Sequence, residues 1–333
     1  MKSIGTLVAA LSLFAALHTF QPEIVRAQKL QKLMMGYPTP GAGVTAEVIR
    51  RGGFFKKNGL DVDLVLLSGS SLLAAAMISG HVPIAQVGAA PMVVSAVGGA
   101  DTVLLACATS FAYGRLFATQ DIKSIPELKG KRLGLTRLGT IDDGILRYVF
   151  KEHGLNPDRD VTFLAAGSGP ERLIALGNGA IDAGIFRAPH DSFAEKSGFN
   201  ELLDVNKAGL YNPASCIGTT KTYVKNNRDT VMRVMKGFVE GLKFFKENRQ
   251  FTLKVAAELT RTTDVEAVSA ILDSPARLQE KVPYVPIKGI EFLLKIAQLR
   301  DPRAKNFDPG FVIDSSFMQE LEKSGFIDSL WKK

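Results

Sequence analysis

A six-residue pattern that occurs twice constrains this chain more than any other feature. Residues 55–60 read Phe-Lys-Lys-Asn-Gly-Leu, and residues 150–155 read Phe-Lys-Glu-His-Gly-Leu, 95 positions later. In both copies the pattern ends a segment with helical periodicity, and its glycine is typical of the position that follows a helix. The repeat indicates one structural unit used twice, and a chain of 333 residues is long enough to hold two such lobes.

Each copy predicts the same order of strands and helices. The strands expected in the first copy are 30–35, 62–67 and 82–87. Those expected in the second copy are 133–135, 161–165 and 181–186. Strands that alternate with helices predict a mainly parallel sheet in each copy. The alternative is a chance similarity, because strand–helix–strand units share glycine punctuation in general.

Two extended segments connect the copies. Residues 102–118 lead from the first copy to the second, and residues 212–220 read as a strand that crosses back. Two crossings form a natural hinge. We therefore predict an α/β fold with two lobes joined by a two-strand hinge. Lobe 1 is expected to comprise residues 28–114 plus 218–333, and lobe 2 residues 115–217.

The segment after residue 223 predicts helices that pack on lobe 1. Apolar side chains recur three and four positions apart over residues 231–245, which defines one apolar helix face. Further helices are expected near residues 252–260, 265–272, 290–299 and 315–323.

Residues 1–27 have the pattern of a secretory signal peptide. Lys2 supplies a positive start, an apolar run follows over residues 4–17, and a Val-Arg-Ala sequence ends at Ala27. The run is close to the lower limit for crossing a bilayer, so an uncleaved anchor is the alternative. No cysteine stands at the cleavage point to accept a lipid. We expect a periplasmic protein that is exported by this signal peptide and is not lipid-anchored.

The two cysteines, Cys107 and Cys216, both lie in apolar, strand-like segments. Export permits a disulfide between them. Buried free thiols are nevertheless common in such segments, and sequence alone does not supply the short separation that a disulfide requires. Free thiols are therefore the favoured expectation.

Charge gives only a general indication of the partner. The chain carries 41 Lys and Arg against 33 Asp and Glu, a net charge of +8. The basic residues are scattered among acidic ones, which favours a generally positive surface over a nucleic-acid groove. Nucleic acid is therefore not an expected partner, and an anionic small molecule is weakly favoured.

A ligand site is expected where the strands end. Ligands of open α/β sheets bind at the carboxyl ends of the strands, and turns from two facing lobes would line one cleft. Glycine and serine turns expose backbone N–H groups at helix N-termini, and arginine pairs with oxyanions. Each residue alone is as readily a helix cap or a surface charge, so the prediction depends on their convergence. The candidate ligand-binding residues are Tyr37, Thr39, Ser68, Ser70, Gly88, Ala89, Tyr113, Arg137, Thr140, Ser168 and Arg187.

Asp142 and Asp143 leave the charge of the ligand open. They stand in the first turn of the helix that follows Thr140, where carboxylates compensate the helix dipole. If either carboxylate pointed into the cleft, the ligand would be a hydrogen-bond donor or a zwitterion rather than a simple anion.

Four segments carry a resemblance to a known family: residues 53–62, 79–85, 121–134 and 179–183. Together they resemble the substrate-binding proteins of ABC importers for nitrate, sulfonates and taurine, which are related to thiamine-pyrimidine-precursor binding proteins. The resemblance covers about residues 30–220. It implies a bilobed periplasmic-binding-protein fold of type II-like topology, in a monomer that delivers its ligand to a permease and ATPase in the inner membrane.

The implied function is capture of a small polar or anionic organic molecule, such as a sulfonate or carboxylate. Sulfonate binders usually carry a small or neutral residue where this chain has Asp142, and the only tryptophan, Trp331, lies far from the expected cleft. Ligand identity therefore does not carry over. Binding of a pyrimidine or thiamine precursor, or a sensory role with the same two-lobed clamp, are the alternatives.

An enzyme is the less favoured function. The chain lacks Gly-x-Ser-x-Gly, Cys-x-x-Cys and His-x-x-x-His patterns, and His190 beside Asp191 is the only acid–base pair of interest. We expect no catalytic residue, no metal site and no cofactor.

Overall fold

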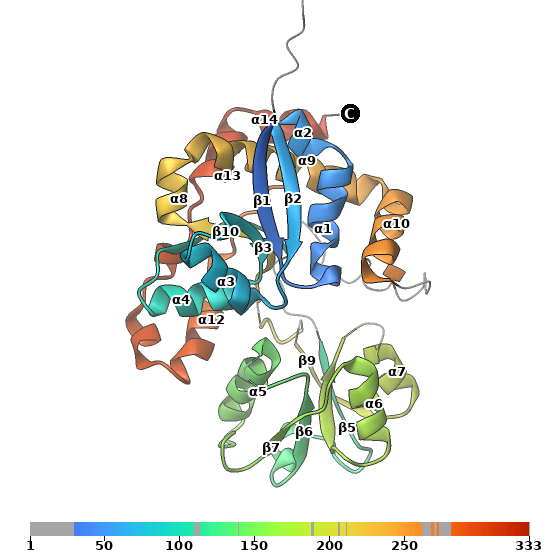
Figure 1. Cartoon of the computed structure of the whole chain (residues 1–333). Coiled ribbons are helices and arrows are strands. Elements are labelled where there is room, and N and C mark those ends of the chain that lie inside the picture. Colours follow the sequence, from blue (N-terminus) through green and yellow to red (C-terminus); the bar gives the residue numbers. More distant parts are fainter. Residues whose placement is uncertain are drawn as a thin grey trace, which may run out of the picture.

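The computed structural model describes residues 30–109, 114–138, 140–187, 190–205, 207–210, 212–261, 268–269, 272 and 281–332. They form two lobes, each built around a five-stranded sheet, with one lobe above the other in Figure 1. The predicted signal peptide, the candidate Tyr113 and most of the helix expected at residues 265–272 lie outside the described residues.

The sheet of lobe 1 has the strand order β2-β1-β3-β10-β4. Its strands are β1 (Gln31–Tyr37), β2 (Leu60–Leu66), β3 (Ile84–Val87), β4 (Thr102–Thr109) and β10 (Ala214–Thr220). Its helices are α1 (Pro40–Arg51), α2 (Phe54–Lys57), α3 (Ser70–Ile78) and α4 (Ala89–Val97). One face of the sheet packs against α1 and α2, and the other against α3 and α4, so each face has its own apolar core.

Lobe 2 repeats this arrangement with the order β7-β6-β8-β5-β9. Its strands are β5 (Arg115–Ala118), β6 (Arg132–Leu135), β7 (Thr162–Ala165), β8 (Ala183–Phe186) and β9 (Asn200–Asp204). Its helices are η1 (Ile125–Leu128), α5 (Ile141–Glu152), α6 (Gly169–Gly177) and α7 (His190–Lys196). In both lobes the first strand of the copy lies between the second and third and runs parallel to them. The predicted doubling of one α/β unit is confirmed.

The C-terminal part of the chain is helical. Its elements are α8 (Lys221–Asn226), α9 (Arg228–Glu247), α10 (Arg249–Thr260), α12 (Ile287–Gln298), η3 (Pro302–Asn306), η4 (Pro309–Val312), α13 (Ser316–Lys323) and α14 (Phe326–Trp331). The apolar face of α9 packs into the core of lobe 1, as its spacing predicts. No helix among the described residues has the length and apolar character needed to cross a membrane.

Helix α12 differs from the expectation because it packs on both lobes. Its Leu293 lies in the core between α4 and the sheet of lobe 1, whereas its Phe292 lies in the core of lobe 2. The ring of Phe292 meets the ring of Tyr148 from α5 edge-on, with centroids 5.2 Å apart. The segment expected to cover lobe 1 therefore also bridges the two lobes.

In each lobe, the direction of the parallel strands places their carboxyl ends on the side of the sheet that faces the other lobe. In lobe 1, β10 starts at the crossing and runs antiparallel to β3, with Val87 at the end of β3 opposite Cys216. In lobe 2, β5 starts at the crossing and runs antiparallel to β8, with Arg115 opposite Phe186 at the end of β8. The carboxyl ends of the parallel strands in each lobe therefore face the space between the lobes. The domain boundary predicted after residue 217 lies inside β10, so the chain returns to lobe 1 earlier than expected.

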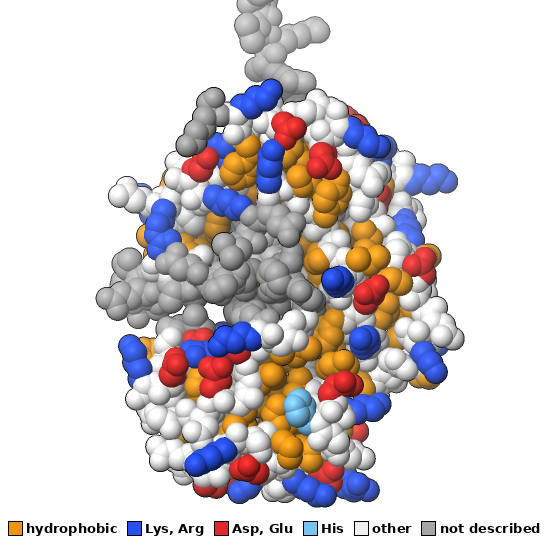
Figure 2. Space-filling model, turned by 180° about the vertical axis from the view of Figure 1, so that it is seen from behind, with side chains coloured by type: hydrophobic (Ala, Val, Ile, Leu, Met, Phe, Trp, Pro, Cys, Tyr) orange, Lys and Arg blue, Asp and Glu red, His pale blue; other side chains and the backbone are white. Residues whose placement is uncertain are grey.

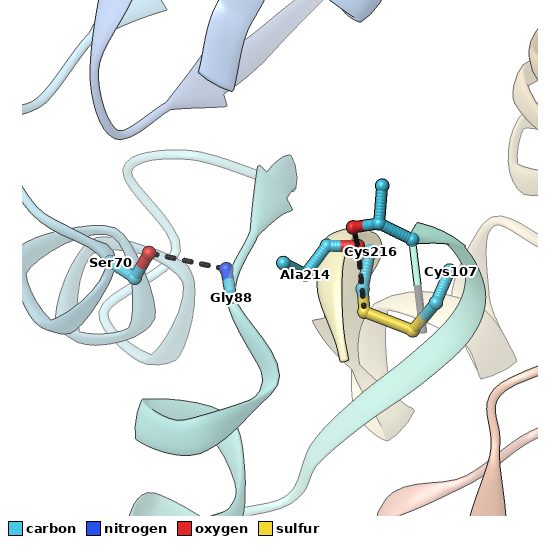
Figure 3. Close-up of a disulfide and its surroundings, with 6 residues drawn as sticks. Ser70, Gly88, Cys107, Ala214 and Cys216 are labelled. Carbon is cyan, nitrogen blue, oxygen red and sulfur yellow. Dashed lines mark hydrogen bonds between the residues drawn. A yellow bond between two sulfur atoms is a disulfide. The ribbon is translucent and has the colours of Figure 1, made fainter. Parts of the chain in front are cut away.

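The expectation of free thiols is wrong, because Cys107 and Cys216 form a disulfide. The two residues stand directly opposite one another in the antiparallel pair β4–β10, and both are buried. Since Cys216 is also opposite Val87, the disulfide lies next to the Gly88 turn (Figure 3). The register that brings the sulfur atoms together joins residues 109 positions apart, and no local pattern in the sequence reveals it.

This disulfide should contribute to stability by restricting the unfolded chain. A loop of this length predicts that the Cys107→Ala/Cys216→Ala double variant loses about 2–4 kcal/mol of unfolding free energy. Urea unfolding of the oxidised protein and of the double variant, followed by circular dichroism, measures the difference. Dithiothreitol should lower the midpoint of the wild type and leave that of the double variant unchanged. An equal response of both proteins to dithiothreitol contradicts the prediction.

Candidate functional site

A cleft of about 1410 Å³ lies between the lobes and is lined by turns that follow parallel strands, by residues of α4, α5 and α12, and by residues 154–158. Five of the predicted ligand-binding residues line it: Thr39, Ser70, Gly88, Arg137 and Thr140. The first three come from lobe 1 and the last two from lobe 2. The structure therefore brings three turns of lobe 1 together with one turn of lobe 2, and the predicted residues Ser168 and Arg187 do not line the cleft.

The turns of lobe 1 hold each other in place. The hydroxyl of Ser70, at the start of α3, accepts a hydrogen bond of 3.1 Å from the backbone N–H of Gly88, at the start of α4 (Figure 3). Thr39 is the N-cap of α1, and its hydroxyl accepts the N–H of Ala42 at 3.2 Å. These caps are local consequences of serine and threonine preceding a helix.

The other candidates in lobe 1 do not line the cleft. Ala89 is buried, and its N–H donates to the carbonyl oxygen of Pro213 at 3.0 Å, so the chain that returns from lobe 2 occupies that donor. Tyr37 is half-buried with its ring against Gly43 of α1, and Ser68 is exposed outside the lining of the cleft.

In lobe 2, Arg137 and Thr140 form one turn at the cleft. Arg137 is exposed, and the hydroxyl of Thr140 donates to its carbonyl oxygen at 2.9 Å. Ser168 is placed differently. The Glu171 carboxylate accepts the N–H of Ser168 at 2.6 Å and bonds its hydroxyl as well, which lowers the pKa of Glu171. The N-terminus of α6 is therefore capped by its own chain.

The two carboxylates whose orientation the sequence left open are both buried against arginines. Asp142 accepts a bidentate pair of hydrogen bonds from Arg187, one of them 2.9 Å long. Asp143 accepts from Arg147 on its own helix at 2.5 Å and from Arg300 after α12 at 2.8 Å. The positive charge of Arg187, a predicted ligand residue, is thus already matched by a carboxylate. The Arg300–Asp143 pair adds a polar link between the lobes beside α12.

Sequence reasoning missed Arg172, a buried arginine at the same edge of lobe 2. Its side chain is 3% exposed. The aliphatic carbons of its side chain pack against two glycines. A Cβ atom added at Gly134 would lie 3.2 Å from Cγ of Arg172, and one added at Gly184 would lie 3.4 Å from its Cδ. In the sequence, position 172 reads as an ordinary charged residue of a helix. Only the glycines in the neighbouring strands β6 and β8 mark the space that it fills.

The guanidinium of Arg172 reaches the carboxyl ends of three strands. It donates to the Thr136 hydroxyl at 3.0 Å and to the carbonyl oxygens of Gly167 and Ile185 at 2.8 and 3.0 Å. Burial lowers the pKa of Arg172, and burial together with the charge of Arg172 lowers the pKa of His190. This edge of lobe 2 therefore contains a desolvated cation beside a histidine whose neutral form is favoured.

The face of the molecule shown in Figure 2 has no concentrated charge that would suggest a larger anionic partner. On this face, Lys and Arg side chains are dispersed among acidic and neutral ones. Among the residues that the structure describes, no group of three or more His, Cys, Asp or Glu side chains is arranged to hold a metal ion.

The chain belongs to the family described as NMT1/THI5-like, which it matches over residues 48–250, more than half of its length. Among similar curated proteins, YtlA of Bacillus subtilis, which is named as a binding protein, is 26% identical over 189 residues. This similarity covers 55% of the chain and 57% of YtlA, so the chain spans little more than half the length of that relative.

Solved structures show the fold. The periplasmic aliphatic sulphonate binding protein SsuA of Escherichia coli is similar with a TM-score of 0.65 and 18% identity, covering 81% of this chain and 91% of SsuA. The desulfurization enzyme DszB is similar with a TM-score of 0.63 and 14% identity, covering 88% of this chain and 99% of DszB. The chain has the bilobed α/β fold of the periplasmic binding proteins, with type II-like topology. The predicted fold class and the family resemblance are confirmed.

The buried carboxylate that links the lobes should be important for stability. Asp143→Ala removes a buried carboxylate that accepts hydrogen bonds from two arginines, and is expected to lower the free energy of unfolding by about 1–3 kcal/mol. The loss is limited because Arg147 keeps Asp158 and the side chain of Arg300 is 62% exposed. Asp158→Ala is the matched control, because Asp158 also pairs with Arg147 but its side chain is 80% exposed. The control should lose less than about 1 kcal/mol. Urea unfolding measures both variants, and equal losses contradict the prediction.

Proposed function

We propose that this protein is the extracytoplasmic solute-binding protein of an ABC importer and captures a small organic anion between its lobes. The observation that carries the proposal is the cleft itself. Turns at the carboxyl ends of strands in both lobes contribute to its lining. On this proposal residues 1–27 act as a signal peptide, and the mature monomer works in the periplasm with a permease and an ATPase. The periplasmic sulphonate binding protein SsuA, which shares the fold, supports this assignment.

The lining of the cleft favours an organic ligand over a small inorganic ion. Val94 of α4 and Leu138 of lobe 2 both line it, although their side chains are 58% and 56% exposed. Exposed apolar side chains on two sides of a cleft gain free energy when an apolar group covers them. Arg137 lies next to Leu138 and supplies a cation. A sulfonate or carboxylate with an apolar body matches both features.

Closure of the lobes is part of the proposed mechanism. A cleft of about 1410 Å³ is larger than most small-molecule pockets, which hold roughly 300–1,000 Å³. A small anion would therefore be enclosed only if the lobes approached each other about the two crossings. Such hinge closure lets the permease distinguish the loaded protein from the empty one.

We propose binding without turnover, although DszB shows that the fold also occurs in an enzyme. His190, the residue with the most suggestive neighbour in the sequence, packs against Gly169 and Phe193 in lobe 2. The other described histidines are His81, which bonds Ser79 at the end of α3, and His153, which bonds the Val149 carbonyl within α5. None of the three contacts an activated nucleophile in the described structure.

Calorimetry and thermal shift with sulfonates, carboxylates, nitrate and pyrimidines test the proposal. A ligand present at a hundredfold excess over its Kd should stabilise the protein by about 2.7 kcal/mol. Arg137→Ala should weaken binding of an organic anion at least about tenfold, or about 1.4 kcal/mol. Arg228→Ala is the control, because Arg228 pairs with Glu320 away from the cleft and its loss should leave affinity unchanged. Chemical conversion of any of these compounds by the purified protein would reject the proposal.

A further inference from the structure

The buried guanidinium of Arg172 has no carboxylate partner. All of its hydrogen bonds go to neutral oxygens, namely one hydroxyl and two backbone carbonyls. Taking an arginine out of water costs several kcal/mol unless an opposite charge compensates it. The nearest acid that acts on it, Asp142, is bound in a bidentate pair by Arg187. Asp142 is thus already engaged by another guanidinium and makes no hydrogen bond to Arg172.

One face of this guanidinium is still open to a ligand. Within the described part of the chain, Nη2 of Arg172 donates to no acceptor, whereas Nε and Nη1 are both used. Nη2 is not among the fully enclosed side-chain atoms that lack a partner, and the guanidinium carbon lies 5.4 Å from the centroid of the Phe186 ring. The Thr136 hydroxyl accepts from Nη1 and still has its own proton to donate, and Thr136 is exposed. Two donors are therefore available side by side where β6 ends.

We propose that Arg172 and Thr136, which adjoin the cleft-lining residue Arg137 and do not line the cleft themselves, form an anion-recognition subsite at its edge, and that this subsite selects organic monoanions over zwitterions. The inference rests on the proposed binding function and deepens it. An oxyanion of a carboxylate or sulfonate would accept from Nη2 of Arg172 and from the Thr136 hydroxyl. It would supply the negative charge that is missing from the hydrogen-bond partners of Arg172.

Selection against zwitterions follows from the same pairs of charges. An ammonium group next to the bound anion would need a carboxylate to replace its lost hydration. Asp142 and Asp143 are the acids in the first turn of α5, and both are buried and bonded to arginines. Neither is available without breaking a buried ion pair. The other described acids that line the cleft are Asp158, which follows the far end of α5 and pairs with Arg147, and Asp301, which pairs with Arg303. An ammonium group near the bound anion is therefore expected to lack compensation.

Two matched pairs of probes measure how an added ammonium group changes the affinity for an organic anion. Ethanesulfonate and taurine differ by one amino group, as do propionate and β-alanine. Isothermal titration of the full-length mature protein should show each monoanion binding at least about tenfold more tightly than its amino counterpart. The stronger of ethanesulfonate and propionate identifies the head group. Equal affinities within both pairs would overturn the selectivity.

Arg172→Met tests the subsite, because methionine keeps an unbranched apolar stem over Gly134 and Gly184 and removes the guanidinium. Affinity for the stronger monoanion should fall at least about tenfold. Arg132→Gln is the control, since Arg132 stands at the opposite end of β6 and bonds Asp182. Circular dichroism and urea unfolding establish that each variant is folded.

Thr136→Val decides the matter if Arg172→Met does not fold. It removes the exposed hydroxyl while nearly preserving the shape of the side chain. Affinity for the monoanion should fall at least about threefold, which corresponds to the loss of a modest hydrogen bond. If the wild type binds ethanesulfonate or propionate but the folded Arg172 and Thr136 variants bind it equally well, this inference is wrong while the proposed function stands. If the wild type binds none of the four probes, the proposed function itself fails.

Discussion

Antiparallel pairing at the two crossings is the constraint on which the rest of the structure depends. Each lobe contains a strand that begins at the crossing, β10 in lobe 1 and β5 in lobe 2, and each pairs antiparallel with the last parallel strand of its unit. That reversal leaves the parallel strands pointing toward the other lobe. Three turns of lobe 1 and the turn of lobe 2 that contains Arg137 and Thr140 therefore line one cleft. The Cys107–Cys216 disulfide holds β4 and β10 together in this region.

Charge pairing in lobe 2 determines what the cleft can offer a ligand. Carboxylates in the first turn of a helix would ordinarily compensate the dipole and repel an anion. Here Arg187 neutralises Asp142, while Arg147 and Arg300 neutralise Asp143. Among the described residues that line the cleft, Arg137 and Lys151 are cations without an ion pair. Both are exposed, so solvent and salt screen their charges easily. The charge of Arg172, at the carboxyl ends of the strands of lobe 2, is screened less because the residue is buried.

Helix α12 limits how the lobes move. It contributes Leu293 to the core of lobe 1 and Phe292 to the core of lobe 2, and Ile296 packs against both. Arg300, just beyond the helix, bonds Asp143 of lobe 2. Any change in the angle between the lobes must either pivot around these contacts or break them. The side of the cleft away from α12 is therefore the side on which the lobes can approach with the least cost.

The sequence by itself determined the repeat, the order of strands and helices in each lobe and the turns that line the cleft. These features follow from local periodicity and from the positions of glycine and serine. Thr39, Ser70, Gly88, Arg137 and Thr140 were predictable from their places after strands. Only the tertiary structure decided that Cys107 bonds Cys216, that α12 bridges the lobes and that Arg172 is buried at the carboxyl ends of the strands of lobe 2. Each of these depends on register or packing between residues far apart in the chain, and a linear pattern carries no information about such distances.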